Sequence, residues 1–376
     1  MARSVRVDGP FVPHRIEPSS DGLLRFCRRG RLPPALGVQV ETIIEVGDAL
    51  KADHAVKLAK QNRILLWRGD FRNALQLLAA MKRRLSRVRP QESSAKTFHN
   101  YRKTTARRAH LLSRVQVDIS PDFELNLPST PDVSEACKQA FGQDLKQRMP
   151  LTEILGALGA QRWRTKGVHV HALGHKIYPH YGVFAPTRQE YIDLVANAPW
   201  PNPHKAFDIG TGTGVLAALL AKRGAESVVA VDIEQRSVDC AHDNVTRLNL
   251  GKKIQIQHQD LFPTGKADLV VCNPPWLPGE VSAPLDAAIY DPDSRMLRGF
   301  LDKLPEHLTD KGEAWLIVSD LAERLGLRTT THKLITQAGL ETKDQLTIRP
   351  RHKARPGDPL AEYRAAEITS LWRITL

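Results

Sequence analysis

The chain is poor in cysteine: 376 residues contain four, and Cys27, Cys137, Cys240 and Cys272 are scattered, with no Cys-x-x-Cys pair. This scatter argues against a disulfide framework and a cysteine zinc site, and it favours a reducing, cytoplasmic setting. No apolar run approaches the roughly 20 residues that span a bilayer. The first residues also lack the apolar core of a signal peptide, so no membrane association is expected.

Positive charge, by contrast, is abundant and unevenly placed. Of the net charge of +13, residues 1–160 carry +11 (27 Lys and Arg against 16 Asp and Glu), and residues 161–376 carry +2. An RNA or ribonucleoprotein substrate is the expected partner of such a surface, although a protein partner stays open and a solvated helical face is the alternative. The candidate substrate contacts are Lys82, Arg83, Arg84, Arg102, Lys103, Arg107 and Arg108.

Hydrophobic periodicity divides the chain into three predicted parts. Residues 1–160 have apolar positions at helical spacing, as over 48–68, and are expected to form a basic, mainly helical substrate-recognition domain. Residues 161–204 alternate near 168–171, which predicts a β-hairpin followed by a linker helix. In residues 205–376 strands alternate with helices, which indicates an α/β fold with a parallel sheet covered on both faces.

The strands of this third part are predicted from short apolar runs. A helix is expected over 321–338, and the two closing strands, with no helix between them, are expected to pair as an antiparallel hairpin at the sheet edge. The predicted strands are 205–209, 227–231, 254–258, 267–272, 312–318, 345–349 and 366–375.

A glycine-rich loop follows the first of these strands. Gly210, Gly212 and Gly214 would allow a tight turn, a close approach of the backbone to a ligand, and packing of the next helix. The spacing is Gly-x-Gly-x-Gly, which ends before the third glycine of a dinucleotide site. S-adenosylmethionine (SAM) has no phosphate, so such a loop can wrap its methionine part, with Asp208 placed to hold the ammonium.

Two further acids end the next strands. Asp232 follows the second strand and is placed to accept from the ribose hydroxyls, and Asp260 follows the third and is placed to accept from an adenine amino group, with Leu261 beside the ring. The alternative is that both are N-cap or loop carboxylates. The candidate cofactor-binding residues are Asp208, Gly210, Thr211, Gly212, Gly214, Asp232, Ile233, Asp260, Leu261 and Asn273.

The fourth strand runs into Asn273-Pro274-Pro275-Trp276, the candidate catalytic residues. Because prolines fix the backbone and remove donors, this turn presents acceptors, namely the Asn273 side-chain oxygen and the Pro274 carbonyl. Two acceptors suit a planar NH₂ group, which Trp276 could stack against. The alternative is a proline-rich turn with a packed tryptophan.

Four histidines, His169, His171, His175 and His180, fall within twelve residues of the predicted hairpin. Strand alternation places only the first two on one face, and no acid or cysteine has ligand spacing. We therefore expect no metal site.

Taken in order, these motifs resemble the class I SAM-dependent methyltransferases whose motif is [N/D]PP[Y/F/W]. The resemblance covers roughly residues 167–376, and the nearest types are the release-factor glutamine methyltransferases (HemK/PrmC type) and the small-domain RNA methyltransferases. It implies a Rossmann-like, seven-stranded domain, SAM as cofactor, and methyl transfer to an amide or exocyclic amino nitrogen. Trp276 replaces the usual Tyr, and the N-terminal domain is longer and more basic than in the release-factor group.

Three functions are compatible with the sequence. The charge asymmetry favours a methyltransferase acting on RNA or a ribosome-associated target. A glutamine methyltransferase of release-factor type is the first alternative, because both acceptors are planar NH₂ groups. An RNA-binding protein with an inactive methyltransferase fold is the second, and Asp208, Asp232, Asp260 and Asn273 argue against it.

Overall fold

The computed structural model describes residues 42–85, 94–142, 147–281, 284–351 and 357–376. The chain divides into a unit of residues 1–40 and a compact unit of residues 41–376, to which all the described residues belong. The first 41 residues of the predicted N-terminal domain therefore lie outside the description. Among the described residues, no helix is both long and apolar enough to cross a membrane.

The N-terminal part combines helices with a small sheet. The sheet has four strands in the order β1-β2-β3-β4, parallel except for the last pair. These are β1 (Ile43–Val46), β2 (Ile64–Trp67), β3 (Val115–Asp118) and β4 (Arg148–Pro150). The helices are α1 (Ala52–Lys60), α2 (Phe71–Arg84), α3 (Ser94–Leu112), α4 (Ser134–Phe141) and α5 (Leu151–Lys166).

Helices predominate in this part, but the small sheet was not predicted. The helix predicted over 48–68 is two elements, because α1 ends at Lys60 and Asn62 adopts a left-handed φ of 61° before β2 begins. All four residues of β2 are buried, and the strand lies inside the sheet. In the sequence this short apolar run continued the helical spacing of the preceding residues, which is why the strand was missed. The Trp67, Met81 and Met149 side chains lie in the core around this sheet.

The predicted hairpin and linker helix are present. Strands β5 (Val168–Val170) and β6 (His175–Ile177) pair antiparallel around the short 3₁₀ helix η1 (His171–Leu173), with Gly174 in the left-handed region. Helix α6 (Glu190–Asn197) follows. This segment packs into the core of the C-terminal part through Val170, Leu173 and Ile177.

The C-terminal part is built on a seven-stranded sheet in the order β12-β13-β11-β10-β7-β8-β9. All pairs from β11 to β9 are parallel, and β13 is antiparallel to both its neighbours, which places β12 at the edge as predicted. The strands are β7 (Lys205–Ile209), β8 (Ser227–Asp232), β9 (Ile254–His258), β10 (Ala267–Cys272), β11 (Leu308–Ser319), β12 (Glu341–Ile348) and β13 (Thr369–Thr375).

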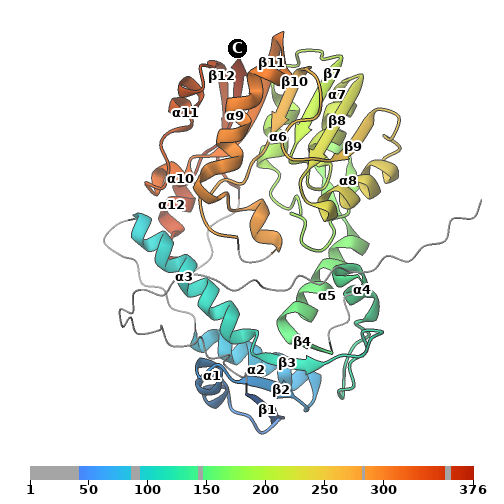
Figure 1. The fold of residues 1–376 in the computed structure, drawn as a ribbon, viewed down its shortest axis with the longest axis vertical. Coiled ribbons are helices and arrows are strands. Elements are labelled where there is room, and N and C mark those ends of the chain that lie inside the picture. The colour runs from blue at the N-terminus through green and yellow to red at the C-terminus, as the bar shows by residue number, and fades with distance from the viewer. Residues whose placement is uncertain (1–41, 86–93, 143–146, 282–283, 352–356) are drawn as a thin grey trace, which may run out of the picture. The chain divides into compact units, whose positions relative to one another are not determined.

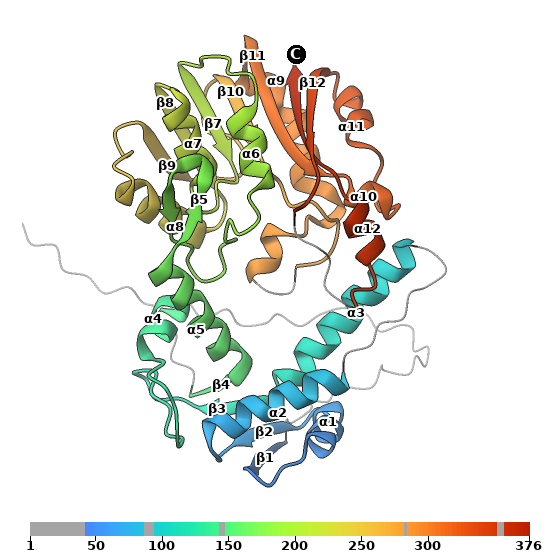
Figure 2. The ribbon, with the colours of Figure 1, turned by 180° about the vertical axis from the view of Figure 1, so that it is seen from behind.

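Helices cover both faces of this sheet (Figures 1 and 2). One apolar core joins the sheet to α6 and α7, and the other joins it to α9 and α11. These helices are α7 (Val215–Arg223), α8 (Gln235–Arg247), α9 (Arg295–His307) and α11 (Thr331–Gln337), with the 3₁₀ turns η2 (Pro284–Ala288) and η3 (Pro292–Ser294) ahead of α9. The fold is thus the predicted Rossmann-like, seven-stranded α/β class.

Two details of the C-terminal expectation were wrong. The helix predicted over 321–338 is two helices, α10 (Leu321–Arg324) and α11, with Gly326 in the left-handed region between them. A helix, α12 (Ala361–Ala366), lies between the two closing strands, where none was expected. Its sequence is too short to produce a clear helical period.

Candidate active site

The candidate site lies where the parallel strands β7, β8, β9 and β10 end. Cys272 at the end of β10 is paired with Ile209 at the end of β7, so Asn273 and Gly210 leave the sheet from neighbouring positions. Asp232 ends the next strand, β8, on the other side of β7. Because these strands are parallel, the topology brings the predicted residues to the same end of the sheet. Open α/β sheets bind ligands at this carboxyl end.

The glycine loop has the conformation that its sequence suggested. Gly210 and Gly214 have φ values of 72° and 78°, which side chains with a Cβ rarely adopt. A Cβ at Gly210 would lie 2.9 Å from Met296 Cε, and one at Gly214 would lie 3.3 Å from Ala241. The backbone conformation therefore favours glycine at both positions, and at Gly214 the close approach to the Ala241 backbone adds to that preference.

Asp208 anchors this loop from inside. Its Oδ2 accepts hydrogen bonds from Thr211 Oγ1 (2.6 Å) and from the Ala217 amide (2.9 Å), and the residue is only 1% exposed. Burial raises the pKa of Asp208 to about 6, although the two hydrogen bonds oppose that shift. Its contact with a SAM ammonium stays a prediction, while its contacts in the structure bind the loop to α7.

The raised pKa predicts a pH-dependent cost in stability. Well below pH 3.8 the carboxyl is protonated in both states, and as the pH rises toward 6 the unfolded state ionises first, which lowers the free energy of unfolding. A shift from 3.8 to about 6 corresponds to about 3 kcal/mol above pH 6. We expect Asp208→Asn to remove this loss, so its unfolding free energy should rise relative to the wild type between pH 4 and 7.

Urea unfolding at several pH values would measure that difference. The exposed Asp302→Asn variant controls for removal of a carboxylate elsewhere. If the gap between Asp208→Asn and the wild type is the same at pH 4 and pH 7, Asp208 does not titrate in this window.

Asp232 faces the same loop from the next strand. Its Oδ2 accepts from the Gly212 amide (2.9 Å) and its Oδ1 from the Glu234 amide (3.0 Å). Burial raises the pKa of Asp232, partly offset by these hydrogen bonds. The carboxylate is thus fixed at the strand end in a defined orientation, with the adjoining Ile233 side chain 53% exposed. Such an exposed apolar side chain beside an oriented carboxylate fits a cofactor with a ribose and a flat base.

The third predicted acid lies at the rim. Asp260 is exposed just beyond β9, and Leu261 next to it has a φ of 56° and packs against the core of the α9 side. A Cβ at Gly299 of α9 would lie 3.0 Å from Leu261 Cδ1, so the helix approaches this loop closely. The residues present at the three strand ends are therefore compatible with SAM, with Asp232 and Ile233 on one strand end and Asp260 and Leu261 on the next.

The Asn-Pro-Pro-Trp turn holds a contact that the sequence reading missed. The Trp276 indole Nε1–H donates to the Asn273 side-chain oxygen at 2.9 Å. The Trp276 ring is partly buried and packs against both cores of the sheet. The sequence feature that could have indicated this hydrogen bond is the spacing of three residues between Asn273 and Trp276. The indole therefore orients the Asn273 carboxamide, whose oxygen keeps a second lone pair for a substrate N–H.

A further residue beyond the turn also shapes the site. Asp291 is 5% exposed and accepts from the Met296 and Leu297 amides (3.0 and 3.1 Å), which fixes the start of α9. Met296 in turn lies against Gly210, as the close approach to its Cε shows. No motif in the sequence singled out Met296.

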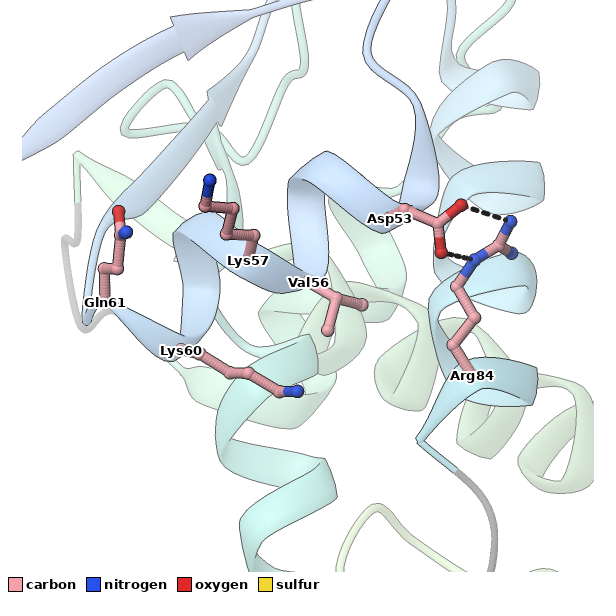
Figure 3. A pocket seen from close by; sticks show the side chains of 6 residues that line it. All are labelled: Asp53, Val56, Lys57, Lys60, Gln61 and Arg84. Carbon is pink, nitrogen blue, oxygen red and sulfur yellow. Dashed lines mark hydrogen bonds and ion pairs between the residues drawn. The ribbon is translucent and has the colours of Figure 1, made fainter.

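The predicted substrate cations do not form one uniform group. Arg84, at the end of α2, makes two hydrogen bonds to Asp53 (2.5 and 3.1 Å), and both line a surface pocket of about 610 Å³ with Lys57, Lys60 and Gln61 (Figure 3). Lys82 and Arg83 are exposed beside it. Arg102 of α3 is mostly buried, with 17% of its side chain exposed, against the segment that follows Trp276.

No group of three metal-binding side chains was found among the described residues. His169 and His171 pack ring against ring at 4.9 Å, and His180 instead lies 2.8 Å from Asp243. Burial lowers the pKa of His180, which favours its neutral form.

The sheet order, the glycine loop with acids at successive strand ends, and the Asn-Pro-Pro-Trp turn define a class I methyltransferase. The sequence profile of the methyltransferase small domain matches residues 176–338. A Methanocaldococcus jannaschii protein named for N5-glutamine methyltransferase activity is 32% identical over 43% of this chain and 83% of its own length. The chain belongs to the methyltransferase small-domain family.

Two other relatives differ in their named acceptors. A release factor glutamine methyltransferase of Thermosynechococcus vestitus is 26% identical over 58% of this chain and 75% of its own. A tRNA1(Val) (adenine(37)-N6)-methyltransferase of Serratia proteamaculans is 38% identical over 22% of this chain and 35% of its own. Both are N-methyltransferases, so the chain is a SAM-dependent N-methyltransferase, as the resemblance implied.

Proposed function

We propose that this enzyme transfers the methyl group of SAM to a planar amide or exocyclic amino nitrogen, on RNA or on a ribosome-associated target. The observation that carries the proposal is the Asn273 side-chain oxygen, held by the Trp276 indole beside the glycine loop. The Asn273 oxygen and the Pro274 carbonyl would accept the two hydrogens of the acceptor NH₂. That arrangement would direct the nitrogen lone pair toward the methyl donor.

Bound SAM would supply a methyl carbon on a positively charged sulfur, which leaves as a neutral thioether when the N–C bond forms. The residues proposed to hold it are Asp232 and Ile233 at the end of β8, Asp260 and Leu261 after β9, and the backbone of the glycine loop. The Asn273 oxygen would accept a hydrogen bond from the acceptor N–H and so stabilise the positive charge that develops on the nitrogen, and the proton would then leave to water.

The choice of RNA rests on charge. The cations concentrate in the first 160 residues, and a polyanion is the partner that such a surface attracts over long range. A protein glutamine of release-factor type is the second candidate, because two of the reported relatives are named for glutamine methylation, one of them on release factor. We also propose the division into a recognition domain (1–160), a hairpin and linker helix (161–204) and a methyltransferase domain (205–376).

Labelling would separate the two acceptors. Purified protein and tritiated SAM would be incubated in two separate reactions, one with total RNA and one with total protein, both from cells that lack the enzyme. We expect label in the RNA fraction, sensitive to ribonuclease and absent with Asn273→Ala. Label confined to the protein fraction would replace RNA by a protein acceptor, and label in neither fraction would contradict the proposed activity.

A further inference from the structure

Helix α3 is packed against the segment that follows the Asn-Pro-Pro-Trp turn. Phe98 of α3 is 1% exposed and lies in an apolar cluster with Leu277, the residue after Trp276, and with Leu321 and Leu325 of the α10 region. At the start of the helix, Ser94 Oγ donates to the Leu325 carbonyl at 3.0 Å. Helix α3 and the segment that follows the Asn-Pro-Pro-Trp turn therefore share one small apolar core.

Arg102 is the polar centre of this contact. Its guanidinium carbon lies 3.5 Å from the centroid of the Tyr290 ring, and its Nη2 donates to the Glu280 carbonyl at 2.6 Å. The same nitrogen lies 3.7 Å from Asp286 Oδ2. Because stacking, hydrogen bonding and charge pairing all engage this guanidinium inside the protein, it is poorly placed to bind a phosphate.

Other residues of the same helix, on both sides of Arg102 in the sequence, are exposed. Asn100, Lys103 and Arg107 are exposed and follow one another at spacings of three and four residues, which places them on one face of a helix. Lys103 and Arg107 are separated by about 6 Å of helical rise. Neither has an ionic partner within the described part of the chain, and the 19 residues of α3 include no Asp or Glu.

We propose that this outward face, Asn100, Lys103 and Arg107 (the α3 face), binds the phosphate backbone of RNA. Arg102 is a positioning residue that holds helix α3 against the segment that follows Trp276. The inference rests on the proposed RNA substrate. An RNA strand bound to the α3 face would lie on a helix whose other side packs against Leu277, the residue after Trp276. Cations without interspersed acids suit a polyanion, so RNA is favoured over a protein of mixed charge.

Salt-dependent binding tests the α3 face. The probe is fluorescently labelled bulk tRNA, since contacts to phosphate do not depend on sequence, and binding would be followed by anisotropy from 50 to 300 mM salt. We expect Lys103→Ala/Arg107→Ala to weaken binding about tenfold or more and to reduce the slope of log K against log salt by about 2. The matched control, Lys252→Ala/Lys253→Ala, removes two exposed cations between α8 and β9 and should leave the slope unchanged.

Two outcomes would overturn the proposed surface. One is an unchanged salt slope in the α3 double variant, and the other is binding of a labelled poly-glutamate peptide that equals tRNA binding and is lost in the same variant. The slope is measured without any methyl transfer. RNA that stays unlabelled while the slope falls would therefore reject the proposed acceptor and keep the surface, and labelled RNA with an unchanged slope would do the reverse.

Arg102 is tested by a different signature. We expect Arg102→Met to keep the tRNA affinity and salt slope within about twofold, because this guanidinium does not touch phosphate, while kcat for RNA methylation falls about tenfold. Arg102→Lys should restore little, since an ammonium cannot stack on Tyr290 in the same way. A slope reduced by about 1 in Arg102→Met would make Arg102 an RNA contact and contradict the positioning role.

Discussion

Asn273→Ala is expected to lower kcat by about 100- to 1,000-fold while leaving the Kd for SAM within about threefold. The magnitude follows from removing one preorganised polar group that acts on charge developing in the transition state. The side-chain oxygen lies at the end of β10, held by the Trp276 indole at 2.9 Å. Single-turnover transfer from tritiated SAM and calorimetric titration with SAM would measure the two quantities.

Two companion variants sharpen this test. Trp276→Phe removes the indole N–H and keeps an aromatic ring, so the Asn273 carboxamide loses its fixed orientation and kcat should fall by less, about tenfold. Asn197→Ala, at the exposed end of α6, controls for the loss of a side-chain amide outside the Asn-Pro-Pro-Trp turn. A normal rate for Asn273→Ala with a labelled acceptor would remove the amide clamp from the mechanism.

The part of the sheet that carries the site was readable from the sequence because β8 and β10 combine a buried apolar run with a polar residue at or directly after the end of the strand. All six residues of β10 except Asp268 are buried, and Asn273 follows directly. The four-stranded N-terminal sheet was not readable in the same way. Its strands have three or four residues each, too few to establish a period of two against the adjoining helices.

Long-range contacts account for what the motifs could not reveal. Arg102 was chosen as a substrate contact by its charge alone, but Tyr290 and Asp286, with which it pairs, lie more than 180 residues further along the chain. Asp208 was assigned to the cofactor by its position before the loop, and its buried hydrogen bonds to Thr211 and Ala217 show a second task inside the fold. The charge of these residues therefore indicated that they could bind a ligand. Only the packing of the folded chain showed which of them hold other parts of the protein in place.

The second large effect is expected at Asp232, where Asp232→Ala should weaken SAM binding by about 100-fold or more. If the carboxylate accepts from two ribose hydroxyls, its removal forfeits about 3 kcal/mol of charge-assisted hydrogen bonding. It also releases the Gly212 amide, which donates to Asp232 Oδ2 at 2.9 Å, so the loop loses an anchor at the same time.

Calorimetry can separate these two losses. Asp232→Asn keeps one oxygen that can accept from Gly212, so it should retain the loop while losing most of the ribose contribution, with an affinity between those of the wild type and Asp232→Ala. Glu234→Ala is the matched control, because it removes a neighbouring exposed carboxylate and keeps the backbone amide that donates to Asp232 Oδ1. Wild-type SAM affinity in a folded Asp232→Ala protein would show that the cofactor is held elsewhere. An affinity for Asp232→Asn as low as for Asp232→Ala would instead show that the negative charge, more than the loop anchor, determines binding at this strand end.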